Sequence, residues 1–329
     1  MADLSDPDAK LAAAVLAGKR RALAKAITLV ESTRVDHEQR AGKLLESLLQ
    51  HTGRTIRIGI SGAPGVGKST FIEALGMQLI AQGKRVAVLA IDPSSAQSGG
   101  SILGDKTRME RLSLCEEAFI RPTPTGGKLG GVAAKTREAL LVCEAAGFDV
   151  IIVETVGVGQ SETAVAGMTD VFVLLQLPNA GDELQAIKKG IVELADIVVV
   201  NKADIDSRAA DVAAGQIKGA LSMLRPSSNS WQPQVLRVSA LKSQGIEGFW
   251  KLIMDYRKTM DETGEFELKR RHQALNWMWM LIESGLSSRF RSHPAVHEAL
   301  PEVTRAVEKG AISPAAAAQQ LLEYSKSKS

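Results

Sequence analysis

Residues 57–70 read RIGISGAPGVGKST, a short apolar stretch that runs into a glycine-rich loop and then into a helical pattern. The loop from Gly62 to Thr70 matches GxxxxGK[ST], and this motif requires a strand before it and a helix after it. Glycine is needed because backbone N–H groups must wrap a phosphate without interference from a Cβ atom. The stretch therefore predicts a phosphate-binding loop between a buried strand and a helix.

The side chains at the end of this loop have predicted parts in binding the phosphates. Lys68 is expected to bridge the β- and γ-phosphates, and the Ser69 hydroxyl is expected to coordinate Mg²⁺. Thr70 is expected to support the α-phosphate through backbone or hydroxyl contacts. The predicted phosphate-binding set is Gly62, Ala63, Pro64, Gly65, Val66, Gly67, Lys68, Ser69 and Thr70.

Further apolar runs follow the loop and alternate with helical stretches. The runs lie at 85–92, 148–155, 170–177, 196–202 and 235–239, and helical candidates lie at 69–82, 132–146, 183–194, 208–224 and 246–261. Because the runs are nearly all apolar rather than alternating, they predict strands buried on both faces of a mainly parallel sheet. The fold class is α/β, a doubly wound sheet with ligands expected at the carboxyl ends of its strands.

A second motif predicts which base is bound. Asn201-Lys202-Ala203-Asp204 directly follows an apolar run and resembles the NKxD motif of GTPases. The Asp204 carboxylate can accept hydrogen bonds from guanine N1–H and the 2-amino group, whereas adenine presents an acceptor at N1. Ser239-Ala240-Leu241 resembles the SAx loop, whose Ala N–H would reach guanine O6. The predicted guanine-binding set is Asn201, Lys202, Asp204, Ser239, Ala240 and Leu241, and the predicted nucleotide is GTP rather than ATP.

Two acidic residues at the ends of apolar runs are expected to complete the metal shell. Asp92 follows RVAVLAI, and Glu154 follows FDVIIV, so that Ser69, Asp92 and Glu154 form the predicted Mg²⁺ set. Glu154-Thr155-Val156-Gly157 occupies the place of the DxxG switch, where the Gly157 N–H can sense the γ-phosphate. Glu in place of Asp lengthens the reach by one methylene group, which favours coordination through water.

The remaining candidates lie on polar, glycine-bearing segments. Asp105 is a candidate for positioning the attacking water and Arg108 for reaching phosphate oxygens, although solvated loop charges are an alternative interpretation. Lys188 belongs to a third candidate switch segment. The predicted catalytic set is Lys68, Asp92, Asp105, Glu154 and Gly157, and the further switch candidates are Arg108, Gln160 and Lys188.

The position after the switch motif predicts slow hydrolysis. Ras-like GTPases carry a water-orienting Gln there, but this chain has Val158, and Gln160 comes two residues later. We therefore predict slow intrinsic conversion of GTP to GDP and phosphate, with missing groups supplied when a partner reorganises the loops.

Helical segments flank the α/β pattern. Residues 7–50 predict two amphipathic helices, and the segments 267–286, 294–309 and 314–325 each have a helical pattern. We divide the chain into a helical N-terminal extension at 1–52, a P-loop GTPase domain at 53–263 and a helical C-terminal arm at 264–329.

Composition excludes several other classes of protein. The formal net charge of +3 among 329 residues is too small to indicate a nucleic-acid groove. No apolar run approaches the roughly 18 to 20 residues of a membrane-spanning helix, and the N-terminus is unlike a secretory signal. Cys115 and Cys143 lack CxxC spacing and indicate no thiolate metal site. We expect a cytoplasmic, soluble protein without nucleic-acid or membrane partners.

Several long segments together resemble the MeaB-type GTPases, which include mitochondrial relatives and proteins once labelled ArgK. The segments are GAPGVGKST, AIDPSS, VETVGVGQSE, LLQLPNAGDELQAIKKGIVELADIVVVNKAD and SAL, and the resemblance covers nearly the whole chain. It implies a SIMIBI-class, metallochaperone-like GTPase that is homodimeric through the C-terminal arm. The arm carries an apolar patch at 277–280 that suits an interface, although packing within one subunit is an equal alternative.

The resemblance also implies a partner. It implies association with adenosylcobalamin-dependent methylmalonyl-CoA mutase, where the GTPase gates cofactor loading and protects the mutase from inactivation. The chain lacks the DxHxxG motif, so we expect it to hold no cobalamin of its own. Three other functions stay open: a nickel-insertion GTPase, whose relatives typically carry His-rich or Cys-bearing sites; a protein kinase, as the old ArgK label suggested; and a GTP-dependent scaffold that does not depend on hydrolysis.

Overall fold

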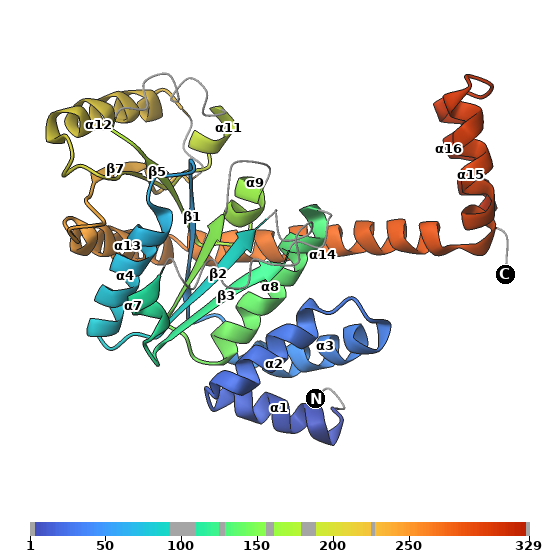
Figure 1. The fold of residues 1–329 in the computed structure, drawn as a ribbon, viewed down its shortest axis with the longest axis horizontal. Helices are drawn as coiled ribbons and strands as arrows, with labels where there is room; N and C mark the ends of the chain where they lie inside the picture. The colour runs from blue at the N-terminus through green and yellow to red at the C-terminus, as the bar shows by residue number, and fades with distance from the viewer. Residues whose placement is uncertain are drawn as a thin grey trace. The chain divides into compact units, whose positions relative to one another are not determined.

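The computed structural model describes residues 4–92, 109–124, 129–155, 161–178, 189–224 and 228–326. The chain forms two compact units, Met1–Gln273 and Ala274–Ser329. The first unit contains a central sheet with helices on both faces, and the described residues of the second unit are helices and their connections (Figure 1).

The sheet is parallel at every described strand pair. Its strands are β1 Ile56–Gly62, β2 Val86–Asp92, β3 Ala118–Pro124, β4 Val150–Thr155, β5 Val171–Gln176, β6 Ile197–Val200 and β7 Gln234–Arg237. Their order among the described residues is β3-β2-β4-β1-β5-β6-β7. From β1 the chain builds first one side of the sheet and then the other, which confirms the predicted doubly wound α/β fold.

The sheet is covered on both faces by α-helices. Those of the first unit are α1 Asp6–Leu16, α2 Arg20–Glu31, α3 Val35–Leu48, α4 Lys68–Ala81, α7 Glu110–Ser113, α8 Leu129–Ala145, α9 Ser161–Ala166, α11 Lys189–Val192, α12 Ser207–Ser222 and α13 Ile246–Glu262, with a 3₁₀ turn at Leu49–His51. On one face α4 and α13 cover strand residues such as Ile58 and Ile60, which are fully buried. On the other face α8 covers Ala87 and Leu89, and the N-terminal helices pack outside α8. Both faces are therefore apolar, as continuous apolar runs require.

Several features differ from the sequence-based prediction, and one of them is helix α9, which was not among the helical candidates. The N-terminal segment forms three helices rather than two, because Gly18 adopts a left-handed φ of +68° after α1 and lets the chain turn before α2. Strand β3 was not predicted, because Pro122 and Pro124 interrupt its apolar pattern. Proline is compatible with a strand at the edge of a sheet, which is the place that β3 occupies.

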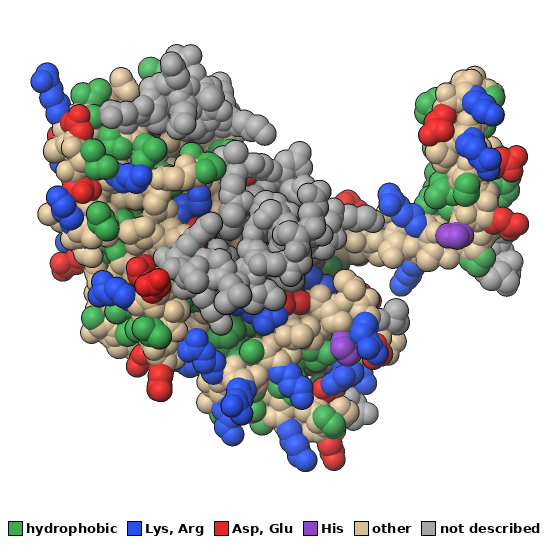
Figure 2. Space-filling model, in the orientation of Figure 1, with side chains coloured by type: hydrophobic (Ala, Val, Ile, Leu, Met, Phe, Trp, Pro, Cys, Tyr) green, Lys and Arg blue, Asp and Glu red, His purple; other side chains and the backbone are tan. Residues whose placement is uncertain are grey.

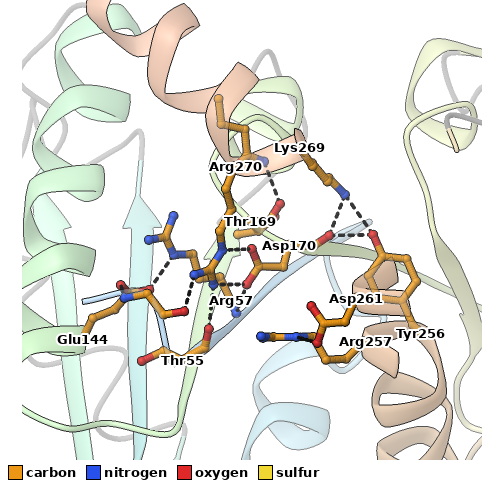
Figure 3. Close-up of polar contacts among 12 residues, drawn as sticks. Thr55, Arg57, Glu144, Thr169, Asp170, Tyr256, Arg257, Asp261, Lys269 and Arg270 are labelled. Atoms are coloured by element: carbon orange, nitrogen blue, oxygen red, sulfur yellow. Dashed lines mark hydrogen bonds and ion pairs between the residues drawn. The ribbon is translucent and has the colours of Figure 1, made fainter. Parts of the chain in front are cut away.

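A network of charged groups lies at the amino ends of the strands (Figure 3). Asp170, just before β5, is 1% exposed in its side chain and accepts two hydrogen bonds of 2.7 Å from Arg270. Lys269 donates to the Asp170 carbonyl and to the Tyr256 hydroxyl, which itself donates to that carbonyl at 2.8 Å. Burial raises the pKa of Tyr256, which keeps this hydroxyl protonated as a donor. The network fixes the start of α14, Glu265–Ser292, to the sheet.

The second unit consists of the rest of α14, together with α15 Pro294–Glu308 and α16 Pro314–Tyr324. Its part of α14 exposes many large apolar side chains, namely Leu275, Met278, Trp279, Met280, Leu281, Ile282 and Leu286. In the part of the chain that the structure describes, no helix combines the length and the apolar character needed to cross a membrane. On the face drawn in Figure 2, basic side chains are interspersed with acidic ones, in keeping with the small net charge.

Candidate functional site

The glycine-rich loop links the end of β1 to the start of α4, as the motif predicts. Gly67 precedes α4 with a left-handed φ of +93°, and Lys68 is the first helical residue. Lys68 Nζ donates to the carbonyl oxygens of Gly62 at 2.6 Å and Ala63 at 3.1 Å. The loop thus folds around Lys68 at the N-terminus of α4. This end of a helix favours negative charge because its backbone N–H groups are unpaired and carry partial positive charge.

Asn201 joins this loop to the candidate base-binding loops. Its Nδ2 donates to the Val66 carbonyl at 2.9 Å, and its Oδ1 accepts from the Ala240 N–H at 3.1 Å. The side chain is buried, so both contacts are made away from competing water. The sequence motif predicted that Asn201 lies near a base, but it did not predict that the side chain links the two loops. The only indication of this link in the sequence is an amide residue at the end of a strand. Ala240 N–H, predicted to reach guanine O6, is here bonded to Asn201.

The Asp204 carboxylate faces the loop that follows β7. A hydrogen bond from Ser239 holds the pKa of Asp204 below its ordinary value, opposed by desolvation and supported by Lys242, whose Nζ lies 3.8 Å away. The carboxylate is therefore ionised at neutral pH and acts as an acceptor only. Lys202, between Asn201 and Asp204, has a φ of +60°, which bends the chain sharply after β6. Leu241 lies on the same loop as Ser239 and is exposed.

Oxygen groups suited to a hard cation lie beside the phosphate-binding loop. Ser69 Oγ is 3.4 Å from Glu154 Oε1, and the Glu154 side chain is buried at the end of β4. In the sheet, Ala90 is paired with Glu154 and Ile91 with Thr155, which places Asp92 on the strand next to Glu154 and just beyond it. Hydroxyl and carboxylate oxygens are the ligands that Mg²⁺ prefers. Within the described ranges, no group of three or more His, Cys, Asp and Glu side chains gathers to hold a metal.

The structure thus brings together the phosphate-binding loop, Glu154, Asn201, Asp204 and the 239–241 loop. The side chain of Asp92 is not among those described. The remaining candidates lie outside the described residues: Asp105, Arg108, Gly157, Gln160 and Lys188.

The sheet order and the glycine-rich loop define a doubly wound P-loop protein, with the loop at the strand from which the two halves of the sheet are built. The family model described as methylmalonyl-CoA mutase-associated GTPase MeaB matches residues 23–295. The chain therefore belongs to this family, and the predicted resemblance is confirmed.

Individual relatives extend the match along nearly the whole chain. A protein of Caulobacter vibrioides is 54% identical over 308 residues, 94% of each chain. The GTPase ArgK of Escherichia coli is 45% identical over 308 residues, 93% of each chain. A crystal structure described as that of a LAO/AO transport system kinase has a TM-score of 0.78 and 37% identity, covering 98% of this chain and 99% of its own.

Gly67→Ala tests how closely the phosphate loop and Asn201 depend on each other. The added Cβ would lie 2.7 Å from Asn201 Nδ2, on a residue whose φ of +93° disfavours any side chain. Strain of this kind costs about 1 to 3 kcal/mol, so we expect guanine-nucleotide affinity, measured by calorimetric titration, to fall about tenfold or more. Gly83→Ala is the control, because Gly83 has a φ of +77° with no atom within 4 Å of the added Cβ. Equal nucleotide affinity in the two variants would contradict the prediction.

Proposed function

We propose that this chain hydrolyses GTP to GDP and phosphate, and that it associates with adenosylcobalamin-dependent methylmalonyl-CoA mutase to gate cofactor loading and protect the mutase from inactivation. The observation that carries the GTPase part is the Asn201 amide, which holds a phosphate loop and a carboxylate-bearing base loop against each other. Membership of a family described as mutase-associated GTPases supports the partner.

In this proposal Asp204 reads the base. Its ionised carboxylate offers two oxygens to guanine N1–H and the 2-amino group, while adenine would set an acceptor against them. Asn201 and Ser239 position the two loops from which the base is read. Rejection of ATP follows, because a buried polar group left unpaired costs far more than a missing apolar contact.

Lys68, Ser69, Asp92 and Glu154 would hold the phosphates and Mg²⁺. Phosphate oxygens would replace the Gly62 and Ala63 carbonyls as acceptors for the Lys68 ammonium group. The Ser69 hydroxyl and the Glu154 carboxylate, 3.4 Å apart, fit a shared cation that is bound directly or through water. When bound, Mg²⁺ supplies positive charge that neutralises the phosphate oxygens.

Hydrolysis by the free protein is proposed to be slow. Val158 stands where a water-orienting Gln is found in Ras-like proteins, so partner-induced rearrangement of the loops is proposed to complete the site. Asp105 and Arg108 are the proposed groups for the water and the phosphate oxygens, and Gly157, Gln160 and Lys188 belong to the proposed switches. No cobalamin site is proposed on this chain, so the cofactor stays with the mutase.

The arm is proposed to form a homodimer. Within the second unit, an apolar groove on α14 is lined by Ala274, Trp277, Met278, Leu281, Ile282, Gly285, Leu286 and Arg289. These positions repeat at intervals of three and four residues and so share one helical face. An exposed apolar helix face of this length suits a second copy of itself.

Asp204→Asn tests the base assignment. The amide that replaces the carboxylate can donate to the 2-oxo group of xanthine but repels the 2-amino group of guanine, so preference should move from GTP to XTP. We expect GTP affinity to fall by about 100-fold or more, measured by competition binding. Asp206→Asn is the matched control, because Asp206 only caps α12 through the Ala209 N–H at 2.9 Å. Unchanged GTP selectivity in Asp204→Asn would remove the base-reading role.

Steady-state hydrolysis with and without the mutase tests the proposed function as a whole. We expect GTP-specific turnover below about 1 per second for the free protein, and a clear increase on adding methylmalonyl-CoA mutase. ATP is the substrate control, and Lys68→Ala controls for contaminating hydrolases. Turnover that the mutase leaves unchanged would contradict the partner, and an absence of GTP hydrolysis in both conditions would contradict the enzyme and favour a scaffold.

Leu281→Asp tests the dimer. A carboxylate in the centre of the apolar groove should shift the protein from dimer to monomer in sedimentation equilibrium, because a buried unpaired charge opposes association. Leu114→Asp is the control, since Leu114 is 85% exposed and lies in the first unit. A wild-type protein that sediments as a single 35.1 kDa chain would show the dimer proposal to be wrong.

A further inference from the structure

Gln273, the last residue of the first unit, holds the carboxyl end of α9. Its Nε2 donates to the Thr169 carbonyl at 2.9 Å and lies 3.5 Å from the Ala166 carbonyl, the last of α9. Gln273 is buried, and it lies one helical turn beyond Lys269 and Arg270. The three side chains differ in what they contact. Lys269 and Arg270 bind groups at the amino ends of strands, whereas Gln273 binds the helix that follows the Glu154 segment.

Arg137 on α8 contacts both Gln273 and the segment just after α9. Its Nη1 donates to the Gln273 carbonyl at 2.8 Å, and its Nη2 donates to the Gly167 carbonyl just after α9. Burial lowers the pKa of Arg137 to about 10, with a smaller effect from Arg57, and the guanidinium is still charged at neutral pH. We call Arg137, Gln273 and the carbonyl groups of Ala166, Gly167 and Thr169 the α9 latch.

The α9 latch is set tightly against the strand that leads to the phosphate loop. A Cβ at Gly59 on β1 would lie 2.6 Å from Thr169 Oγ1 and 2.7 Å from Val165 Cγ1. Because α9 packs this closely on β1, a shift of α9 cannot be absorbed by empty space and must move its neighbours. Glu154 and α9 are separated in the chain by Thr155 and residues 156–160 only.

The hydrogen bonds of the Gln273 amide are made by its donor group. Gln273 Oε1 is buried without a hydrogen-bond partner among the described residues. An unpaired buried acceptor disfavours the folded state, so the favourable polar contacts of this side chain are those of its Nε2 donor.

We propose that the α9 latch carries the nucleotide state of the Glu154 segment into helix α14, so that Gln273 and Arg137 are positioning residues for this helix. This inference rests on the proposed function, because it requires the segment after Glu154 to respond to the γ-phosphate. Lys269 and Arg270 fix the first turns of α14 to the sheet, and the α9 latch contacts the next turn of the same helix through Gln273. The turn that holds Gln273 belongs to the same helix as residues 274–292, because α14 continues to Ser292.

Hydrogen exchange on the full-length protein tests the latch. The amides of 274–292 are followed with Mg²⁺ and either GDP or a non-hydrolysable GTP analogue bound at saturation. In the wild type we expect exchange in this segment to differ about five-fold or more between the two nucleotides. Gln273→Met keeps the length of the side chain but removes the amide donor, and it should abolish most of that difference while nucleotide affinity is unchanged.

Lys269→Met is the matched control, because it also removes a polar contact of the root of α14 but leaves α9 untouched. It should keep the difference between nucleotides. If Gln273→Met does not fold, Arg137→Lys replaces it, since a lysine keeps the charge but cannot reach both carbonyls. A difference that survives in the latch variant, or one that is lost equally in Lys269→Met, overturns the proposal.

The wild type separates this proposal from the proposed function. The latch proposal alone is contradicted if the wild-type protein hydrolyses GTP and responds to the mutase but shows equal hydrogen exchange in 274–292 with both nucleotides. A wild-type protein that fails to bind GTP contradicts both the latch proposal and the proposed function.

Discussion

The side-chain amide of Asn201 is the interaction on which the candidate site depends. The phosphate loop follows β1, the Asp204 loop follows β6 and the Ser239 loop follows β7, and no backbone hydrogen bond of the sheet joins β1 to β6. Asn201 joins all three loops by donating to Val66 and accepting from Ala240. A buried amide that is satisfied on both sides fixes one geometry, because any displacement leaves a polar group unpaired. The separation between the phosphate loop and the loops that carry Asp204 and Ser239 is therefore fixed by this amide.

At the amino ends of the strands, charged side chains fix the arrangement. Asp170 and Arg270 form a bidentate pair with little access to solvent, and Arg270 also donates to the Gly53 and Thr55 carbonyls at the approach to β1. A buried ion pair contributes modest net stability, yet breaking it leaves an uncompensated charge, so it specifies one arrangement strongly. Here the arrangement specified is where α14 begins (Figure 3). The same sheet thus carries the candidate site at the carboxyl ends of its strands and anchors the start of a long helix at their amino ends.

The accuracy of the sequence-based prediction followed the strength of the local pattern. The strand at 148–155, the helix at 246–261 and the helix start at Pro294 were predicted within about two residues, because apolar runs, helical periodicity and proline at a first turn are local signals. Strand β3 was missed because an edge strand needs no continuous apolar run. The N-terminal helices were undercounted because the left-handed turn at Gly18 lies within an amphipathic pattern that is otherwise continuous.

The sequence by itself determined the glycine-rich loop between β1 and α4 and the doubly wound α/β class, and it predicted the base-reading motif, since each depends on residue types at short, regular spacing. Only the tertiary structure decided that Asn201 contacts Val66, 135 residues away, and that Gln273 contacts Thr169, 104 residues away. Such contacts depend on strand order and on which helix packs against which strand. Those choices arise from packing the whole core at high density, and no local periodicity records them.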